Sequence, residues 1–575
     1  MPALHQYDYL FAFGTIFCAL DAFNIGANDV ANSFATSVSS KSLTMKQACF
    51  AAAIMEFLGA VTVGARVADT IKNGIISVSI FRGDPGVQLL AFVCALVSSS
   101  VWLTVCTRLS WPVSTTYSIV SAVAGVGVAV GGGDAVNWGW NGGKGLATIF
   151  AGFGIAPAIS AGFGAVVYLL VKYGVLARKN PIPYALFSGP LVFFTVSAVM
   201  TMSIVYKGAP SLGLNKLSES TTAAAIVGTA AVVSALSVLF WLPYVYAKVI
   251  RKDYTIRFYH FFLGPALWWR PAPEDAGLDT APTHVPDYRI RKDEDGNEFK
   301  VPVVSDDGES GSEKTHGTPA ATANHPSNLK ELEKVDEHPI EGAWAEPKNL
   351  YIIFRYKAYP WIKKVLTHGT SIDIHAEQIG KEGTAHHRRM EEMHAAAKQY
   401  PNEVEHMYSF VQVLTACTAS FAHGANDVSN AIGPYAAIYH IWSTGEFSTS
   451  KNPVPVWILV FGAVMIVIGL ATYGYNIMKV LGNNLTLHSP SRGFSMELGA
   501  AITVILASNY GLPVSTTMCI TGATMGVALC NGDFRAVNYR TLLWIFSGWV
   551  ITVPVVGTIA GCLMGIILNA PHFTS

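Results

Sequence analysis

A seven-residue polar stretch occurs twice in this chain, first as Gly26-Ala27-Asn28-Asp29-Val30-Ala31-Asn32 and again as Gly424-Ala425-Asn426-Asp427-Val428-Ser429-Asn430. A second motif follows each copy, first as Pro112-Val113-Ser114-Thr115-Thr116 and then as Pro513-Val514-Ser515-Thr516-Thr517. The two motifs are separated by roughly 86 residues in one copy and 89 in the other, which indicates a duplicated unit. All four stretches lie in apolar sequence, where polar groups are typical of a transport site shared by two halves.

The composition is that of a membrane protein. Of the 575 residues, 51% are hydrophobic and 13% are charged, whereas soluble domains carry about 25% charged residues. The mean hydropathy is +0.38. The formal net charge is zero, which argues against a nucleic-acid binder because such proteins need a basic surface. The eight cysteines form no CxxC pair, so neither a zinc site nor a disulfide framework is indicated.

Apolar segments long enough to cross a bilayer divide the chain into four parts. Segments of about 20 mainly apolar residues predict an all-α polytopic protein with about 12 transmembrane helices. We expect a first transport repeat over 1–175, two additional transmembrane helices over 176–250, and a second repeat over 406–575. The polar region 251–405 is predicted to be a cytosolic loop, largely disordered with amphipathic segments.

The number of predicted spans sets how the two repeats face the membrane. Seven spans separate the two repeat starts, and an odd number makes the second copy enter from the opposite side. This predicts two inverted repeats, with half-helices at the midplane after Pro112 and Pro513. Short loops on one side carry more lysine and arginine, for example Lys41, Arg108 and Arg178. The positive-inside rule therefore places both termini outside and the long loop in the cytosol.

The first motif has the residue types of a cation site. On a helix, Asn28, Asp29 and Asn32 share one face. Amide and carboxylate oxygens are hard ligands that suit an alkali cation at a kinked segment. The alternative is hydrogen bonding between helices, worth about 0.6 kcal/mol on average in membranes. Because an aspartate inside a membrane is costly and occurs here twice, we favour function. The second copy repeats the arrangement with Asn426, Asp427 and Asn430.

The second motif fits the start of a helix that binds an anion. Proline is favoured at the first helical position, and the following residues expose backbone N–H groups beside serine and threonine hydroxyls. An ordinary helix cap is the alternative, but a cap needs one such residue, not three. Two opposed half-helices would hold a tetrahedral oxyanion between them. The predicted anion ligands are Ser114, Thr115, Thr116, Ser515, Thr516 and Thr517.

Further acidic residues lie in apolar sequence. Glu56 and Glu497 could bind a cation, carry a proton or brace the fold, and we predict a role for both in coupling ion and anion movement. Asp21 lies shortly before the first motif and has no counterpart in the second repeat.

At these motifs the chain closely resembles the inorganic phosphate transporter (PiT) family of sodium-coupled phosphate symporters, especially its fungal high-affinity members. Phe23-Asn24-Ile25 and Ser489-Pro490-Ser491-Arg492-Gly493-Phe494 add to the resemblance. It implies phosphate at the two serine-threonine motifs. It also implies sodium, the one metal expected, at the two asparagine-aspartate motifs. Glu56 and Glu497 match glutamates that the family needs for phosphate transport. Tyr117 stands where many relatives have histidine, which bears on proton coupling.

We therefore predict a multi-pass plasma-membrane symporter that moves phosphate into the cell with sodium by alternating access. Sodium is a cosubstrate and no cofactor is expected. The expected partners are phosphate, sodium and the lipid bilayer, with a homodimer and regulatory proteins on the cytosolic loop as further candidates. The alternatives are a proton-coupled phosphate or sulfate permease and a phosphate-sensing receptor. An enzyme is disfavoured because no histidine or lysine base adjoins the serine-threonine motif in sequence.

Overall fold

The computed structural model divides the chain into two compact units, Met1–Pro286 with Thr367–Ser575, and Asp287–Leu366. The described residues are 2–64, 67–68, 70–71, 74–81, 83–140, 145–207, 217–253, 255–271, 290–292, 298–300, 344–379, 384–449 and 452–570.

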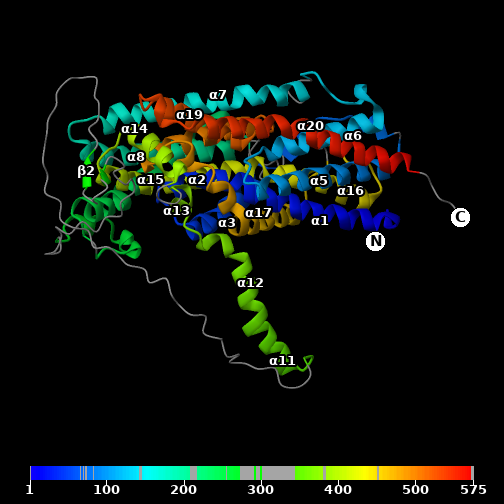
Figure 1. Cartoon of the computed structure of the whole chain (residues 1–575), viewed down its shortest axis with the longest axis horizontal. Helices are drawn as coiled ribbons and strands as arrows, with labels where there is room; N and C mark the ends of the chain where they lie inside the picture. Colours follow the sequence, from blue (N-terminus) through cyan, green and yellow to red (C-terminus); the bar gives the residue numbers. More distant parts are fainter. Residues whose placement is uncertain are drawn as a thin grey trace. The chain divides into compact units, whose positions relative to one another are not determined.

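The first unit is built from long helices that follow one another along the chain (Figure 1). Its N-terminal part contains α1 (Asp8–Ile25), the π-helix η2 (Gly26–Val30), α2 (Ala31–Ser39), α3 (Met45–Thr62), α5 (Pro85–Arg108), α6 (Thr115–Gly131), α7 (Leu146–Val171), the π-helix η6 (Lys172–Leu176), α8 (Pro181–Lys207), α9 (Glu219–Leu236), the π-helix η9 (Ser237–Trp241), α10 (Leu242–Val245) and the π-helix η10 (Tyr246–Ile250).

The C-terminal part of this unit repeats the pattern. It contains α15 (Asn402–Asn426), α16 (Val428–Thr444), α17 (Val456–Met478), α18 (Pro490–Asn509), α19 (Thr516–Leu529) and α20 (Tyr539–Asn569). Figure 1 places the start of α1 and the end of α20 at one end of this unit and α14 (Ala385–Ala396) towards the other.

Seven helices among the described residues are long and apolar enough to cross a membrane, while α6 and α19 are shorter apolar helices. The prediction of a helical multi-pass membrane protein is confirmed, and the described residues are nearly all-helical. The count of about 12 spans and the inverted layout stay predictions.

The helical unit exposes large apolar side chains on its outer surface and buries several acidic residues within its apolar interior. On α20, Leu543 is 68% exposed and Ile566 is 69% exposed, as expected for side chains that face lipid. Asp29, Asp427 and Glu497 are buried. A bilayer offers no water to such groups, so the helices must satisfy them internally.

The first motif helix packs closely against α17. A Cβ atom on Gly26 would lie 1.9 Å from the Ile466 carbonyl oxygen, and a Cβ on Gly469 would lie 1.9 Å from the Phe23 carbonyl oxygen. Glycine at both positions is therefore required for the two backbones to approach so closely.

The second motif helix makes the corresponding contact with α3. A Cβ on Gly424 would lie 2.3 Å from the Glu56 carbonyl oxygen, and a Cβ on Gly59 would lie 2.1 Å from the Phe421 carbonyl oxygen. Each motif helix thus packs against a helix from the other half of the sequence.

The structure differs from the expected loose loop at the C-terminal side of 251–405. Gln378, on α13 (Ile374–Ile379), donates through Nε2 to the Met478 carbonyl at 2.6 Å. A ring nitrogen of His394, on α14, lies 2.9 Å from the Asn483 carbonyl. These buried contacts join α13 and α14 to the helical unit. On the N-terminal side, the 3-10 helix η11 (Phe258–Trp268) follows η10. Most of 271–350 lies outside the described residues.

The second unit combines a short ladder with a helical rod. Its antiparallel strands, β1 (Ile290–Lys292) and β2 (Glu298–Lys300), are the two strands among the described residues. The rod comprises α11 (Pro347–Ile352), the π-helix η12 (Ile353–Ala358) and α12 (Tyr359–Leu366).

Candidate functional site: two crossed aspartate-threonine pairs

The two motif aspartates lie at breaks in their helices. Asp29 is part of the π-helix η2, which joins α1 to α2. Asp427 lies between the end of α15 and the start of α16. π-turns interrupt the regular hydrogen-bond ladder and are frequent at functional sites. Asp29 is 1% exposed and Asp427 is fully buried, so both carboxylates depend on internal partners.

Threonine hydroxyls from both serine-threonine motifs donate to these carboxylates. Asp29 accepts from Thr115, in its own half, and from Thr517, in the other half. Asp427 accepts from Thr516, in its own half, at 2.5 Å and from Thr116, in the other half, at 2.9 Å.

The pairing is therefore crossed: each aspartate takes the second residue of one Ser-Thr-Thr run and the third residue of the other. All four sequence motifs meet at one place. The predicted cation and anion residues form a single polar cluster, which we call the aspartate-threonine cluster.

The motif asparagines tie the cluster together. Asn32 donates to the Thr517 hydroxyl at 2.7 Å, and Asn430 donates to the Thr116 hydroxyl at 3.1 Å. Asn426 donates to the Val514 carbonyl at 2.6 Å. These bonds use the amide nitrogens and leave the amide oxygens for other partners.

Three amide oxygens in the cluster accept no hydrogen bond from the described residues. They are the Oδ1 atoms of Asn32, Asn426 and Asn430. Buried acceptors are normally satisfied, so three together, beside two carboxylates, suit a cation that accepts oxygen ligands. Asn28 differs, because its Oδ1 accepts from the Val113 backbone N–H at 3.1 Å.

The two serines of the predicted anion set cap their own helices. The Ser114 hydroxyl accepts from the Tyr117 backbone N–H at 3.2 Å, and Ser515 accepts from Met518 at 3.3 Å. They fix the starts of α6 and α19, which positions the threonines that follow.

Glu56 and His423 extend the cluster on the side of Asp427. A Glu56 carboxylate oxygen lies 2.7 Å from His423 Nδ1, and the other accepts from the Ser420 hydroxyl at 2.8 Å. His423 Nε2 lies 3.2 Å from an Asp427 oxygen. Potential ligand atoms of Asp29, His423 and Asp427 all lie within 4.8 Å of one another. A buried histidine therefore lies between Glu56 and the cluster.

Sequence reasoning missed His423. The available signal was its position directly before the second Gly-Ala-Asn-Asp motif, where the first copy has the apolar Ile25. Its partner Glu56 was predicted as a coupling residue, but the pairing joins residues 367 positions apart.

Glu497 forms a separate buried network. Its carboxylate accepts from Thr36 and Ser37 at 2.5 Å each, from Thr415 at 2.6 Å and from Gln412 at 3.1 Å. These donors come from α2 and α15, whereas Glu497 belongs to α18. The two glutamates predicted together thus have different surroundings: Glu56 contacts a histidine of the site, and Glu497 joins three helices.

Tyr117 contacts α7. Its hydroxyl donates to the Ile149 carbonyl at 3.1 Å, and its ring stacks on Phe153 with centroids 3.9 Å apart. In this chain the residue after Ser-Thr-Thr therefore packs against a neighbouring helix.

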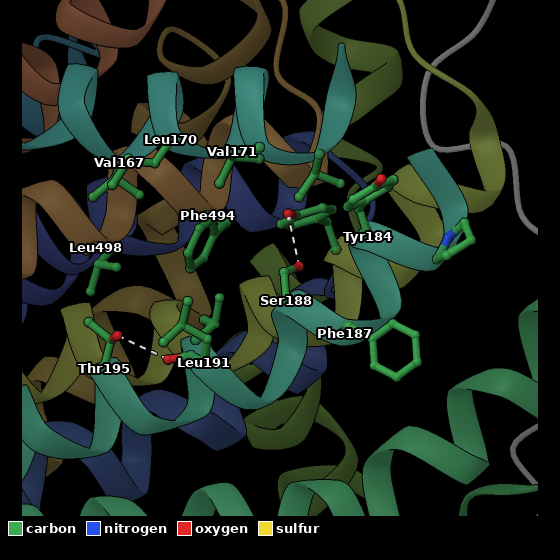
Figure 2. A pocket seen from close by; sticks show the side chains of 15 residues that line it. Val167, Leu170, Val171, Tyr184, Phe187, Ser188, Leu191, Thr195, Phe494 and Leu498 are labelled. Atoms are coloured by element: carbon green, nitrogen blue, oxygen red, sulfur yellow. Dashed lines mark hydrogen bonds between the residues drawn. The ribbon is translucent and has the colours of Figure 1, made fainter. Parts of the chain in front are cut away.

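An apolar pocket of about 680 Å³ lies apart from the cluster, between α7, α8, α15 and α18 (Figure 2). Phe187, Leu191 and Phe494 are among its lining residues. Its lining residues make two polar contacts: the Ser188 hydroxyl lies 3.3 Å from the Tyr408 hydroxyl, and the Thr195 hydroxyl donates to the Leu191 carbonyl at 2.9 Å. A pocket of this character does not suit a hydrated anion, so the aspartate-threonine cluster remains the candidate site.

Buried carboxylates, hydroxyls and unsatisfied amide oxygens at broken helices define a membrane carrier of small ions. Residues 25–560 match the model of the phosphate transporter family, so the chain belongs to this family. It is 44% identical to the phosphate-repressible phosphate permease pho-4 of Neurospora crassa, over 99% of both chains. The human sodium-dependent phosphate transporter 1 is 29% identical, with 93% of this chain and 92% of that one covered.

A solved structure described as the sodium-dependent phosphate transporter shares the fold. Its TM-score is 0.63 at 24% identity, covering 98% of this chain and all of the other. The family and these relatives are transporters, which confirms the predictions of a family resemblance and of a protein that is not an enzyme.

Proposed function

We propose that this protein carries inorganic phosphate into the cell together with sodium by alternating access. The observation that carries the proposal is the aspartate-threonine cluster. There, three amide oxygens that have no hydrogen-bond partner in the described part of the chain adjoin two buried carboxylates. Sodium would take these oxygens as ligands. The added positive charge would then allow a phosphate anion to approach carboxylates that otherwise repel it.

In this proposal the threonine hydroxyls donate hydrogen bonds both in the present structure and in the state with sodium and phosphate bound. They donate to Asp29 and Asp427 in the present structure. With sodium bound to the carboxylates, the same hydroxyls turn towards phosphate beside the free N–H groups at the starts of α6 and α19. Two sodium ions with monovalent phosphate carry one net positive charge. The membrane potential therefore assists uptake by about 2.3 kcal/mol per 100 mV.

The proposal includes the inverted arrangement of the two halves, the plasma membrane as location, both termini outside and the central segment in the cytosol. The names of the relatives support sodium dependence and phosphate as the substrate. A homodimer and regulatory proteins on the central segment stay predictions.

Labelled phosphate uptake by proteoliposomes that contain the purified protein tests the proposal. Uptake is expected to be several-fold faster with an inward sodium gradient than with choline, and excess sulfate is expected to leave it unchanged. Equal uptake in sodium and choline would exclude sodium coupling, and full competition by sulfate would exclude phosphate selectivity.

One rival has a specific observation in its favour. The chain of Glu56, His423 and Asp427 has the residue types of a proton relay, as a proton-coupled permease requires. In the same experiment, uptake from choline medium that rises with an inward proton gradient would favour this rival.

A further inference from the structure

The apolar pocket between α7, α8, α15 and α18 opens towards the surface that faces lipid. Leu170 and Phe187 line it and are each 70% exposed. In Figure 2, Val171 from α7 and Leu191 from α8 point into the same space. Both helices belong to segments long and apolar enough to cross a membrane, so an occupant enters this pocket from the bilayer. We call the space the α7–α8 pocket.

The lining of the α7–α8 pocket suits a hydrocarbon chain. The lining residues that the structure describes include none with a charged side chain. The hydroxyls of Ser188 and Tyr408 pair with each other, and the Thr195 hydroxyl donates to a backbone carbonyl, so these polar groups have partners within the pocket wall. The volume of about 680 Å³ is usual for a small-molecule site, for which the range is about 300–1,000 Å³.

The pocket also has about the length of one leaflet of the bilayer. On α8 its lining residues run from Pro183 to Thr195, a distance of about 18 Å along a helix. The hydrocarbon core of a bilayer is about 30 Å thick, so each leaflet contributes about 15 Å. One acyl chain of a phospholipid therefore matches the pocket from end to end.

Two basic residues lie at the end of the pocket where α7 leads into α8. Arg178 and Lys179 belong to the short connection between η6 and α8, and both are exposed. The Arg178 guanidinium lies 5.5 Å from the centre of the Tyr184 ring, and its Nε donates to the Gly174 carbonyl at 3.4 Å. Tyr184 and Gly174 both line the pocket, so a positive charge lies directly at its end.

This connection lies at the level of the lipid headgroups. It joins two candidate spans, Leu146–Leu176 and Pro181–Val205, and a short connection between two spans must lie at a membrane surface. The proposed orientation makes this the cytosolic surface, where anionic lipids are concentrated. Basic pockets between transmembrane helices on this side are suited to acidic headgroups.

We propose that the α7–α8 pocket binds one acyl chain of an anionic phospholipid, with the headgroup held by Arg178 and Lys179. A guanidinium can bind a phosphate through two N–H groups. A headgroup with a net negative charge is favoured over zwitterionic phosphatidylcholine, because the two basic residues attract the additional charge. The proposal goes beyond phosphate transport and does not depend on which ion the protein carries.

Photo-crosslinking tests the proposal with two lipids that differ only in the headgroup. The purified full-length protein is reconstituted in phosphatidylcholine vesicles that contain a trace of phosphatidylserine or phosphatidylcholine with a diazirine in one acyl chain, and labelled peptides are identified by mass spectrometry. We expect peptides from 167–195, which include most of the lining, to be labelled at least about fivefold more by the serine probe. Equal labelling by the two probes would overturn the proposal.

Arg178→Gln and Arg108→Gln form a matched pair. Arg108 ends α5 and is also exposed, but it belongs to a helix that does not line the pocket. We expect Arg178→Gln to lower the preference for the serine probe about fivefold, the effect of losing one basic residue near the membrane surface. Arg108→Gln should keep the wild-type preference. Equal preferences in the two variants would contradict the role given to Arg178.

Filling the pocket should exclude the acyl chain whatever its headgroup. A Cβ atom at Gly174 would have no atom of the described residues within 4 Å, so a leucine there extends into open space. Gly162 on α7 has the same free space but does not line the pocket. Labelling of the pocket by both probes should fall several-fold in Gly174→Leu and stay unchanged in Gly162→Leu. Unchanged labelling in Gly174→Leu would refute the assignment.

Two measurements on the wild-type protein keep the proposal testable if a variant does not fold. Raising the ionic strength from about 0.1 M to 1 M shortens the Debye length from about 10 Å to 3 Å, so the preference for the serine probe should decrease. A preference that does not change with salt would contradict a role for the basic residues. If a second copy of this chain covers the pocket, labelling will fall as the amount of protein per vesicle rises, and that result would also overturn the proposal.

Discussion

The two motif helices make the same backbone contact with different chemistry around it. In one half, Gly26 packs on the Ile466 carbonyl and is preceded by Ile25. In the other, Gly424 packs on the Glu56 carbonyl and is preceded by His423. The buried Ile25 and Ile466 of the first contact thus correspond to the buried pair of His423 and Glu56 in the second. We call these the apolar end and the polar end of the site.

This difference makes the two aspartates unequal. Asp427 has His423 nearby and also accepts from the amide nitrogens of Asn426 and Asn430. Asp29 accepts from two threonine hydroxyls. The charge on Asp29 therefore depends more on a bound cation, while the charge on Asp427 is supported by the protein. A duplicated sequence has produced one site with two different ends.

The largest loss of stability is expected when His423 is removed from its pair with Glu56. His423→Ile leaves Glu56 buried without its ion pair, and breaking such a pair costs about 3–5 kcal/mol. Thermal unfolding of the purified variant measures the loss. Ile25→Val, at the corresponding position of the apolar end, is the control and should cost about 1 kcal/mol. Equal losses would show that His423 and Glu56 do not stabilise each other.

Replacing both partners makes the two ends alike. In Glu56→Ile with His423→Ile, an apolar pair replaces the charged one, and we expect most of the stability lost in His423→Ile to return. Phosphate uptake should stay at least about tenfold below wild type, because the removed groups contact the site. Normal uptake by the double variant would show that the charged pair has no part in transport.

Substitutions of the two aspartates distinguish an effect on sodium binding from an effect on protein stability. Asp29→Asn and Asp427→Asn should each raise the half-activating sodium concentration about tenfold, the effect of losing roughly 1.5 kcal/mol from a charged ligand. Asp427→Asn should also lower the unfolding temperature more, since it leaves His423 beside a neutral amide. Unchanged sodium activation in Asp29→Asn would remove its assigned role.

The smallest effects concern the serine caps, where the two halves are alike. Ser114→Ala and Ser515→Ala should each destabilise the protein by about 1 kcal/mol, because the caps have matching geometry. Thermal unfolding and the half-saturating phosphate concentration are measured on both variants. A phosphate effect larger than the stability effect would place the serines in direct contact with the anion. Very different losses in stability would show that the two caps are not equivalent.

Local sequence patterns predicted the helical class of the protein and placed helix starts near both Pro-Val-Ser-Thr-Thr motifs. The expectation that proline takes the first helical position was wrong: α6 and α19 start three residues later, at Thr115 and Thr516. The preceding serine caps each helix, which was the alternative interpretation. The four motifs also lie together in the structure, as the duplicated polar residues in apolar sequence indicated. The ions assigned to these residues stay predictions.

The contacts between the halves could not be predicted from sequence. Whether Thr517 bonds to Asp29 or to Asp427 depends on how α19 crosses η2, and no local pattern encodes that crossing. The same holds for Glu56 and His423, whose pairing requires α3 to lie on α15. The threonines were expected to face an anion, and in the structure their protons are directed to the aspartates.

The glycine contacts between the halves fix how closely the halves approach. Gly26 fits the backbone of α17 and Gly424 fits that of α3. A backbone carbonyl is present whatever side chain its residue carries, so no substitution in the opposite half makes room for a Cβ at either glycine. A hybrid that joins the first half of one relative to the second half of another would therefore keep this spacing as long as both glycines are present.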